Sequence, residues 1–163
     1  MQKAKDSFYL ALRTRLAALN PNRTVFLRGS TRPGIVVEEA EAPVSQLPTD
    51  IFVLRWTALS VNSRLPMPLV AEECQILYST AGSASFGGLD RGRMLTEMDK
   101  ELRQLLLPAS TPKLDNTQTP AVALATKVFW TAPIFLAAEN TRDRISRAVR
   151  VTVLSYQEQG ETA

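Results

Sequence analysis

Histidine is missing from the sequence, and cysteine occurs once, as Cys74, among the 163 residues. Histidine is the commonest general base and the commonest metal ligand in proteins, so its absence removes the simplest route to acid–base catalysis and to a transition-metal site. A single cysteine cannot form a disulfide within the chain, so the sequence gives no sign of an oxidising compartment.

Long apolar runs are also missing. The longest wholly apolar run, Ala132 to Ala138, is far shorter than the roughly 20 residues needed to cross a bilayer. The N-terminal stretch MQKAKDSFYLALRTRLAAL has charges throughout, unlike the uninterrupted apolar core of a signal peptide. We therefore expect a soluble, cytoplasmic protein that does not interact with membranes.

The familiar catalytic motifs are absent as well. The segment Gly82–Gly88 lies between a predicted strand and a predicted helix, where phosphate-binding loops occur, but the P-loop pattern requires Lys and then Ser or Thr after its second glycine. Gly88 and Leu89 follow Gly87 instead, which favours a flexible turn. The serines have no histidine partner, and no Gly-x-Ser-x-Gly elbow occurs. We therefore predict no catalytic residue and no cofactor, and we expect the protein not to be an enzyme.

Two weaker candidates for chemistry have simpler interpretations. Cys74 would be a nucleophile only beside an activating base or cation, and its place on an apolar strand face favours a packed core. Five glutamates would bind a hard cation if the fold brought them together, but solvated strand edges are the preferred interpretation. These glutamates are Glu38, Glu39, Glu41, Glu72 and Glu73. The sequence therefore predicts no metal site.

The composition is that of an ordinary globular domain. Hydrophobic residues make up 45% and charged residues 21% of the chain, so we expect a single domain over residues 1–163. The net charge of +3 is too small to indicate nucleic-acid binding, although the isoelectric point near 9.3 is compatible with it.

The clearest element is a helix between Gly87 and Pro108. Its apolar residues follow helical spacing and share one face: Met94, Leu95, Met98, Leu102, Leu105 and Leu106. Asp90 is the predicted N-cap, and Pro108 ends the helix because it cannot donate a backbone hydrogen bond. Asp99 and Arg103 lie four residues apart with the acid first, which favours an ion pair on the surface.

A second helix and six strands are predicted around this helix. The helix covers residues 6–19, and the strands cover residues 25–27, 35–41, 51–61, 70–81, 122–135 and 147–156. The segment 109–120 is polar and contains two prolines, so we expect a flexible loop or arm there. Residues 157–163 are expected to be frayed.

The alternation of apolar residues predicts the buried faces of the two longest strands. Strand 51–61 places Leu59 on the side opposite to Phe52, Leu54, Trp56 and Ala58. In strand 70–81 the shared face consists of Val70, Cys74, Ile76 and Tyr78. The element order α-β-β-β-β-α-β-β then predicts an α+β fold, in which two helices pack on one face of an antiparallel or mixed sheet.

Two surfaces are candidate interfaces. The proline-rich loop Ser63–Leu69 carries Arg64, Leu65, Met67 and Leu69, which either contact another subunit or fold back on the core of their own chain. The strongest basic cluster consists of Arg142, Arg144, Arg147 and Arg150. It forms a solvated surface, a protein interface or a phosphate-binding patch.

The order of the elements resembles a known family. An N-terminal helix (FYLALRTRLAAL) precedes a hydrophobic strand pair (DIFVLRWTALSV and ECQILYSTAG). A helix that opens after a small-residue turn at Asp90-Arg91 (LDRGRMLTEMDKELRQLLL) and a closing strand (RAVRVTVLSYQEQ) follow. This pattern resembles the tail-terminator and tail-completion proteins of long-tailed bacteriophages, and it is similar to related neck proteins of phage-derived particles.

The resemblance implies a non-enzymatic structural role in a phage or prophage tail. Subunits of this family assemble into a homo-oligomeric ring, commonly a hexamer, which caps the tail tube and offers a surface to the head connector. On this basis the loop Ser63–Leu69 and the arm Ala109–Pro120 are the expected contact elements, and the protein is expected to end up in a virion or a phage-derived particle.

Two other classes of protein remain open. One is a small α+β ligand-binding or regulatory domain that forms a dimer through an exposed sheet edge. The other is a nucleic-acid-associated protein that uses the arginines between residues 142 and 150, although nucleic acid is the less favoured partner.

Overall fold

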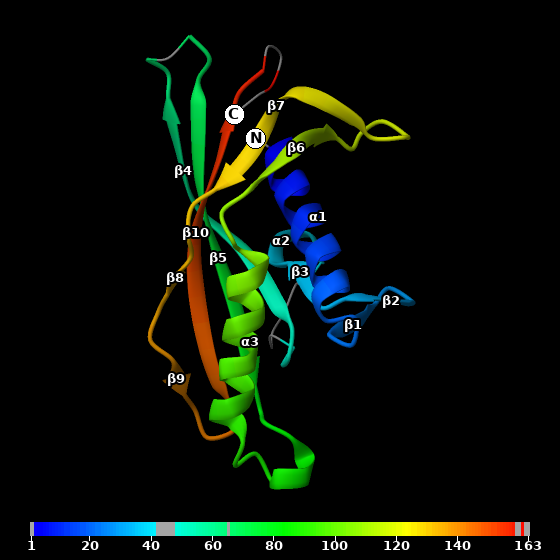
Figure 1. Cartoon of the computed structure of the whole chain (residues 1–163), viewed down its shortest axis with the longest axis vertical. Helices are drawn as coiled ribbons and strands as arrows, with labels where there is room; N and C mark the ends of the chain where they lie inside the picture. The colour runs from blue at the N-terminus through cyan, green and yellow to red at the C-terminus, as the bar shows by residue number, and fades with distance from the viewer. Residues whose placement is uncertain (1, 42–47, 65, 159–160, 162–163) are drawn as a thin grey trace.

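The computed structural model describes residues 2–41, 48–64, 66–158 and 161. Over these residues it confirms the α+β class, with two long helices, a mixed sheet of eight strands and a separate two-stranded sheet (Figure 1). The helices are α1 (Gln2–Leu19), the short α2 (Glu38–Glu41) and α3 (Arg91–Leu105). The strands are β1 (Thr24–Leu27), β2 (Ser30–Pro33), β3 (Ile35–Val37), β4 (Phe52–Asn62), β5 (Leu69–Thr80), β6 (Ser110–Asp115), β7 (Val122–Trp130), β8 (Ile134–Phe135), β9 (Glu139–Asn140) and β10 (Ile145–Tyr156).

The sheet is built on the antiparallel pair β5–β10. These two strands pair along their whole length, from Ile145 opposite Thr80 to Tyr156 opposite Leu69. The order across the sheet is β3-β4-β5-β10-β7-β6, with β8 and β9 also pairing with β10. Only β3 and β4 pair in parallel, so the sheet is mixed, as expected.

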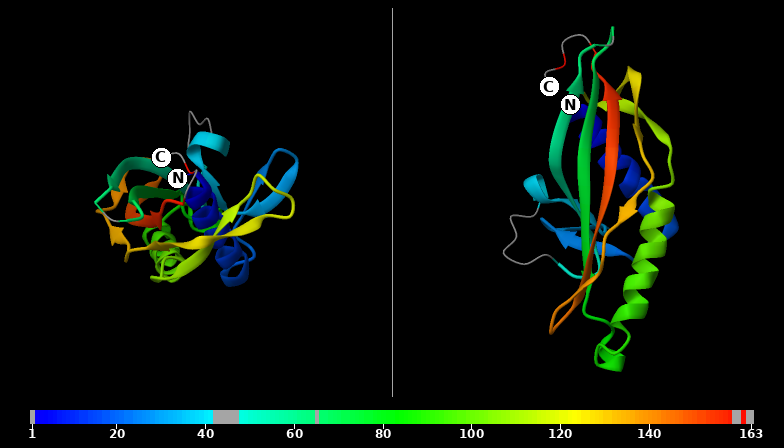
Figure 2. Two further views of the ribbon diagram at one scale, coloured as in Figure 1. Left: turned by 90° about the horizontal axis from the view of Figure 1, so that it is seen from above. Right: turned by 90° about the vertical axis from the view of Figure 1, so that its left-hand side faces the viewer.

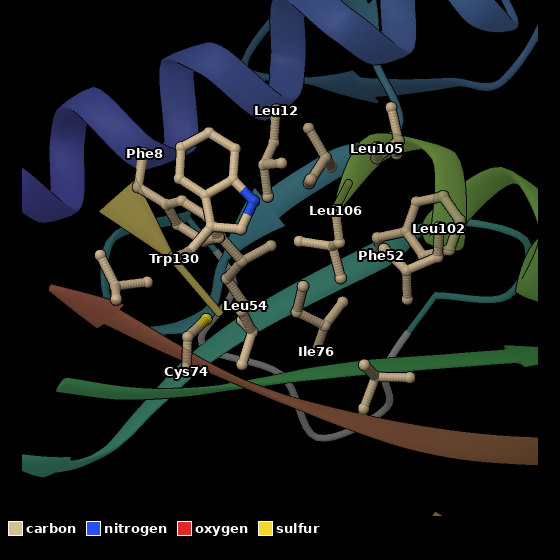
Figure 3. Close-up of a cluster of buried hydrophobic side chains, with 14 of the residues drawn as sticks. Phe8, Leu12, Phe52, Leu54, Cys74, Ile76, Leu102, Leu105, Leu106 and Trp130 are labelled. Carbon is tan, nitrogen blue, oxygen red and sulfur yellow. The ribbon is translucent and has the colours of Figure 1, made fainter. Parts of the chain in front are cut away.

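Helices α1 and α3 cover the same face of this sheet, which leaves the other face outside (Figure 2). Phe8 and Leu12 of α1 and Leu102 of α3 meet the inward residues of the sheet in one hydrophobic cluster (Figure 3). The Phe8 ring meets Trp130 of β7 edge to face, with ring centroids 5.2 Å apart. The predicted apolar face of α3 is therefore confirmed where it contacts the sheet.

Strand β4 contains a β-bulge that reverses the predicted sides of its second half. Trp56 pairs with Cys74, but Ala58 pairs with the next residue, Glu73, so that Thr57 is the extra residue. After this bulge Leu59 pairs with Glu72 and lies on the helix side of the sheet. The prediction that Leu59 lies on the side opposite to Trp56 is wrong because alternation alone assumes regular pairing.

The segment predicted as a flexible loop, residues 109–120, contains the edge strand β6, so that prediction is wrong for Ser110–Asp115. Strand β6 pairs with β7, and its backbone N–H at Leu114 donates to Ser7 Oγ of α1 at 2.8 Å. Lys113 is buried because its Nζ donates to the Tyr156 carbonyl and to Glu161 Oε2, each at 2.6 Å.

A second buried polar residue of β6 also has its own partners. Asp115 Oδ2 lies 3.0 Å from Lys3 Nζ, and Asp115 Oδ1 accepts from the Thr117 hydroxyl at 2.6 Å. The hydrogen bonds from Thr117 and Lys3 lower the pKa of Asp115 to about 2. Its carboxylate is therefore kept charged in a position that would otherwise favour an apolar side chain.

The C-terminal residues that the structure describes are held by hydrogen bonds. Gln157 N donates to the Pro68 carbonyl at 2.8 Å, and Glu158 Oε1 accepts from Thr126 N at 2.8 Å. Together with the Lys113–Glu161 pair, these bonds show that the expected fraying is wrong for residues 157, 158 and 161.

Two further segments differ from the sequence prediction. Residues 30–33, which were not among the predicted strands, form β2, which pairs with β1 in a tight hairpin. Arg28 and Gly29 at its turn both take positive φ, as a two-residue hairpin turn requires. The strand predicted at 35–41 ends at Val37, where the chain turns into α2.

We predict that Lys113→Met lowers the free energy of unfolding by roughly 3 kcal/mol, because it leaves the buried Glu161 carboxylate without its cation. Chemical denaturation measures this difference. Lys127→Met, at an exposed position on the paired strand β7, is the matched control and changes stability by no more than about 0.5 kcal/mol. Equal, small effects of both substitutions would show that residues 110–115 form the loop that the sequence suggested.

Candidate interaction surface

The tip of the β4–β5 hairpin lies at one end of the elongated molecule, beyond the helices (Figure 1), and β10 pairs with β5 as far as Leu69. Six consecutive residues of β4, Thr57–Asn62, are all exposed, whereas Phe52, Val53 and Leu54 at the start of the strand are buried. Leu59 is 50% exposed and Val61 is 44% exposed. The second half of β4 is thus a strand that has no core beneath it.

The partner strand β5 is better covered at the same level. Val70 and Glu72 are buried there, opposite Val61 and Leu59 of β4. Glu72 Oε1 lies 3.2 Å from Lys5 Nζ of α1, and burial raises the pKa of Glu72 although Lys5 opposes the shift. Because of the bulge, Leu59 and Val61 lie on the same face of the sheet as the Glu72 carboxylate, which is paired with Lys5.

The tip of the hairpin contains the first group of predicted interface residues. Arg64 is exposed, and Met67 is 42% exposed, so at these positions the loop does not fold back on its own core. Leu69 begins β5 and is half-buried. Leu65 lies outside the described residues.

The second predicted group, the arginine cluster, is not brought together on one face. Arg147 faces α3, because it shares the inward side of β10 with Val149. Arg150 points to the opposite face of the sheet and is exposed. Arg142 is exposed in the turn before β10, and Arg144 is half-buried. The prediction of a single basic patch is therefore wrong, since neighbouring residues of a strand point to opposite sides.

Asp99 forms a buried polar network that the sequence prediction missed. Asp99 is 7% exposed and accepts from the Tyr78 hydroxyl of β5 and from Arg147 of β10. Burial, followed by the adjacent Asp99 carboxylate, raises the pKa of the Tyr78 hydroxyl. Arg103, the partner expected from sequence, instead lies over the Phe135 ring at 4.9 Å.

A signal for this network was present in the sequence. Asp99 lies four residues after Leu95 and three before Leu102, so it belongs to the apolar face of the helix that packs on the sheet. A charged residue on such a face requires a buried partner, and the inward side of β10 supplies one in Arg147.

The glycine-rich loop is folded around a carboxylate of its own chain. Asp90 does not cap α3 with its side chain, but accepts from Ser83 N at 2.9 Å and from the Ser83 hydroxyl at 2.8 Å. These bonds lower the pKa of Asp90. Gly82 has φ +77°, and a Cβ there would lie 2.8 Å from Asp90 Oδ1. The donors that a phosphate would use are therefore occupied.

The remaining candidates for chemistry serve the packing of the fold. Cys74 is fully buried, and burial raises the pKa of its thiol, which opposes thiolate chemistry. Three of the glutamates pair with separate cations: Glu38 with Arg55, Glu41 with Arg32, and Glu72 with Lys5. Among the described residues, no group of three or more His, Cys, Asp and Glu side chains is placed to hold a metal ion.

A hollow of about 760 Å³ lies on the sheet face opposite to the two long helices. Val53, Leu77 and Ala148 contribute apolar side chains to it, and the Glu38–Arg55 ion pair lies at its side. Glu38 and Arg55 pair with each other, and Glu139, Arg144 and Arg147 line the hollow as well.

Comparison of the chain with protein-family models finds no match, and comparison with curated proteins finds no significant relative. Within the part of the chain that the structure describes, no helix has both the length and the apolar character needed to span a membrane.

We predict that Arg147→Ala destabilises the fold by about 2–3 kcal/mol, because it removes the cation that pairs with buried Asp99. Arg103→Ala is the matched control on the neighbouring face of α3 and costs less than about 1 kcal/mol, the value of an exposed cation–aromatic contact. Thermal or denaturant unfolding measures both. A larger loss of stability for Arg103→Ala than for Arg147→Ala would instead favour the surface pair Asp99–Arg103 that the sequence suggested.

Proposed function

We propose that this protein is a non-enzymatic structural subunit that assembles with copies of itself into a ring. In this proposal the ring caps a tail tube in a bacteriophage or a phage-derived particle and contacts a head connector. The observation that supports the proposal best is the uncovered second half of β4, which exposes the apolar residues Leu59 and Val61 at an edge of the sheet.

Strand β5 lies between this half of β4 and β10, which pairs with β5 as far as Leu69, so the second half of β4 is the outermost strand of the sheet at this level. Leu59, Val61 and Met67 are each between 42% and 50% exposed and lie along one projecting element. Burying them against another chain would remove this apolar surface from water and contribute roughly 25 cal/mol for each square ångström buried.

A cyclic ring requires two different contact surfaces on each subunit. The hairpin tip and the turn that contains Arg142 lie at opposite ends of the elongated molecule (Figure 1). They therefore satisfy this requirement as a pair of distinct candidate surfaces. The arm Ala109–Pro120 contributes less than the resemblance implied, because β6 is committed to α1 and β7, and only residues 116–120 at its end are all exposed.

One observation also favours the alternative of a regulatory domain that forms a dimer. The exposed second half of β4 is a sheet edge of the kind that such dimers use. The nucleic-acid alternative has less support, since Arg147 and Arg150 point to opposite faces of the sheet.

We predict that the purified protein forms a closed particle of several 18.0 kDa subunits, which sedimentation velocity and negative-stain electron microscopy would detect as a ring. Met67→Asp weakens this assembly by at least about tenfold in the dissociation constant, because it places a charge in the contact. The control is Phe26→Asp, at a residue that is 70% exposed in the β1–β2 hairpin, outside both candidate surfaces. A dimer that never grows would favour the regulatory alternative, and a monomer at all accessible concentrations would contradict both.

A further inference from the structure

We propose that the outer edge of β4, Thr57–Asn62, accepts a backbone strand from a second copy of the chain, so that the sheets of neighbouring subunits become continuous. The inference rests on the self-assembly in the proposed function, but the contact is two-fold and joins two subunits, in addition to the two different surfaces that close a ring. Its basis is the difference between the two edges of the same sheet.

The β4 edge loses its partner strand abruptly. Strand β3 pairs only with Phe52, Val53 and Leu54, and the chain then leaves the sheet as α2. Arg55 marks the end of the covered part, because its Nη2 donates to Glu38 Oε1 of α2 at 2.6 Å. From Thr57 onward no described strand pairs with the outer side of β4.

The uncovered stretch lacks most of the devices that prevent edge pairing. Natural edges carry charged side chains, prolines or bulges, or are very short. Thr57–Asn62 contains no charged residue, no proline and no glycine. The bulge at Thr57 lies at its start, and the five residues that follow pair regularly with β5. Their backbone groups on the outer side therefore remain available over roughly 15 Å of strand.

The opposite edge of the sheet is protected by the devices that β4 lacks. Strand β6 contains Pro112, which has no N–H to donate, and the charged residue Lys113. Helix α1 packs along this strand, and the Leu114 N–H is used by Ser7 Oγ. One edge is thus protected within the subunit, whereas β4 is left open over Thr57–Asn62.

A second copy of the chain fits this edge by charge and by shape. The stretch carries no charge that would select an oppositely charged partner, and the net charge of +3 opposes self-association only weakly. If two copies of the stretch pair antiparallel about Ser60, Leu59 of one meets Val61 of the other on the same face. The small residues Ala58 and Ser60 then share the other face, so no like charges meet.

The test is amide hydrogen exchange of the wild-type protein at two concentrations. Sedimentation velocity is used to choose one concentration at which the protein is assembled and one at which it is dissociated. We expect at least some of the amides of residues 57–62 to exchange about tenfold or more slowly in the assembled state, because strand addition hydrogen-bonds the backbone itself. Assembly with unchanged exchange at these residues would overturn the strand addition and leave the ring intact. A protein that stays monomeric would overturn both.

Variants provide an independent measurement. Leu59→Lys combined with Val61→Lys is expected to abolish assembly, whereas Ile134→Lys, at an exposed residue (64%) of β8, leaves it unchanged. Oxidation of Ser60→Cys gives a covalent dimer if two β4 strands meet about a two-fold axis, and Cys74 does not compete because it is fully buried. If this covalent dimer forms but no larger particle is detected, the result would support strand addition and contradict the ring. The inference would be overturned if the double variant Leu59→Lys/Val61→Lys assembled as well as the control Ile134→Lys.

Discussion

The pairing of β5 with β10 along their whole length is the constraint on which the rest of the structure depends. Strand side chains alternate between two faces, so this register places Cys74, Ile76 and Val149 together on one side. A shift by one residue would turn all of them to the other face. The apolar side must be covered, and α1 and α3 lie on it because their own apolar faces have no other place to be buried (Figure 3).

The elements with strong periodicity could be predicted from the sequence for this reason. The faces of α3 and β5 follow from spacing alone, and the structure confirms them at Leu102 and Ile76. Strand β6 could not be predicted in this way, because Lys113 and Asp115 are buried by partners far away in the chain, Glu161 and Lys3. A polar segment resembles a loop unless those distant partners are known.

The candidate surface was predicted in part. Met67 is exposed at the hairpin tip, as the proline-rich loop suggested. The positions of Leu59 and Val61 could not be predicted, because the bulge at Thr57 depends on pairing with β5 and leaves no mark in the alternation. The arginines do not form one patch for a simpler reason. Arg147 and Arg150 are three residues apart in the same strand, so their side chains point to opposite faces of the sheet.

The unequal treatment of the two sheet edges connects the fold to its proposed role. Closing an edge within a subunit uses side chains and a helix, as Ser7 and α1 do at β6. At β4 the corresponding cover ends with Glu38 and Arg55, although the strand continues in regular pairing to Asn62. This half of β4 is held by its pairing with β5, which β10 supports on its other side. The strand is therefore already extended, which lowers the conformational entropy lost when another chain pairs with it. In the proposed role the protein acts through backbone groups and apolar side chains presented at an edge, which Thr57–Asn62 of β4 offers.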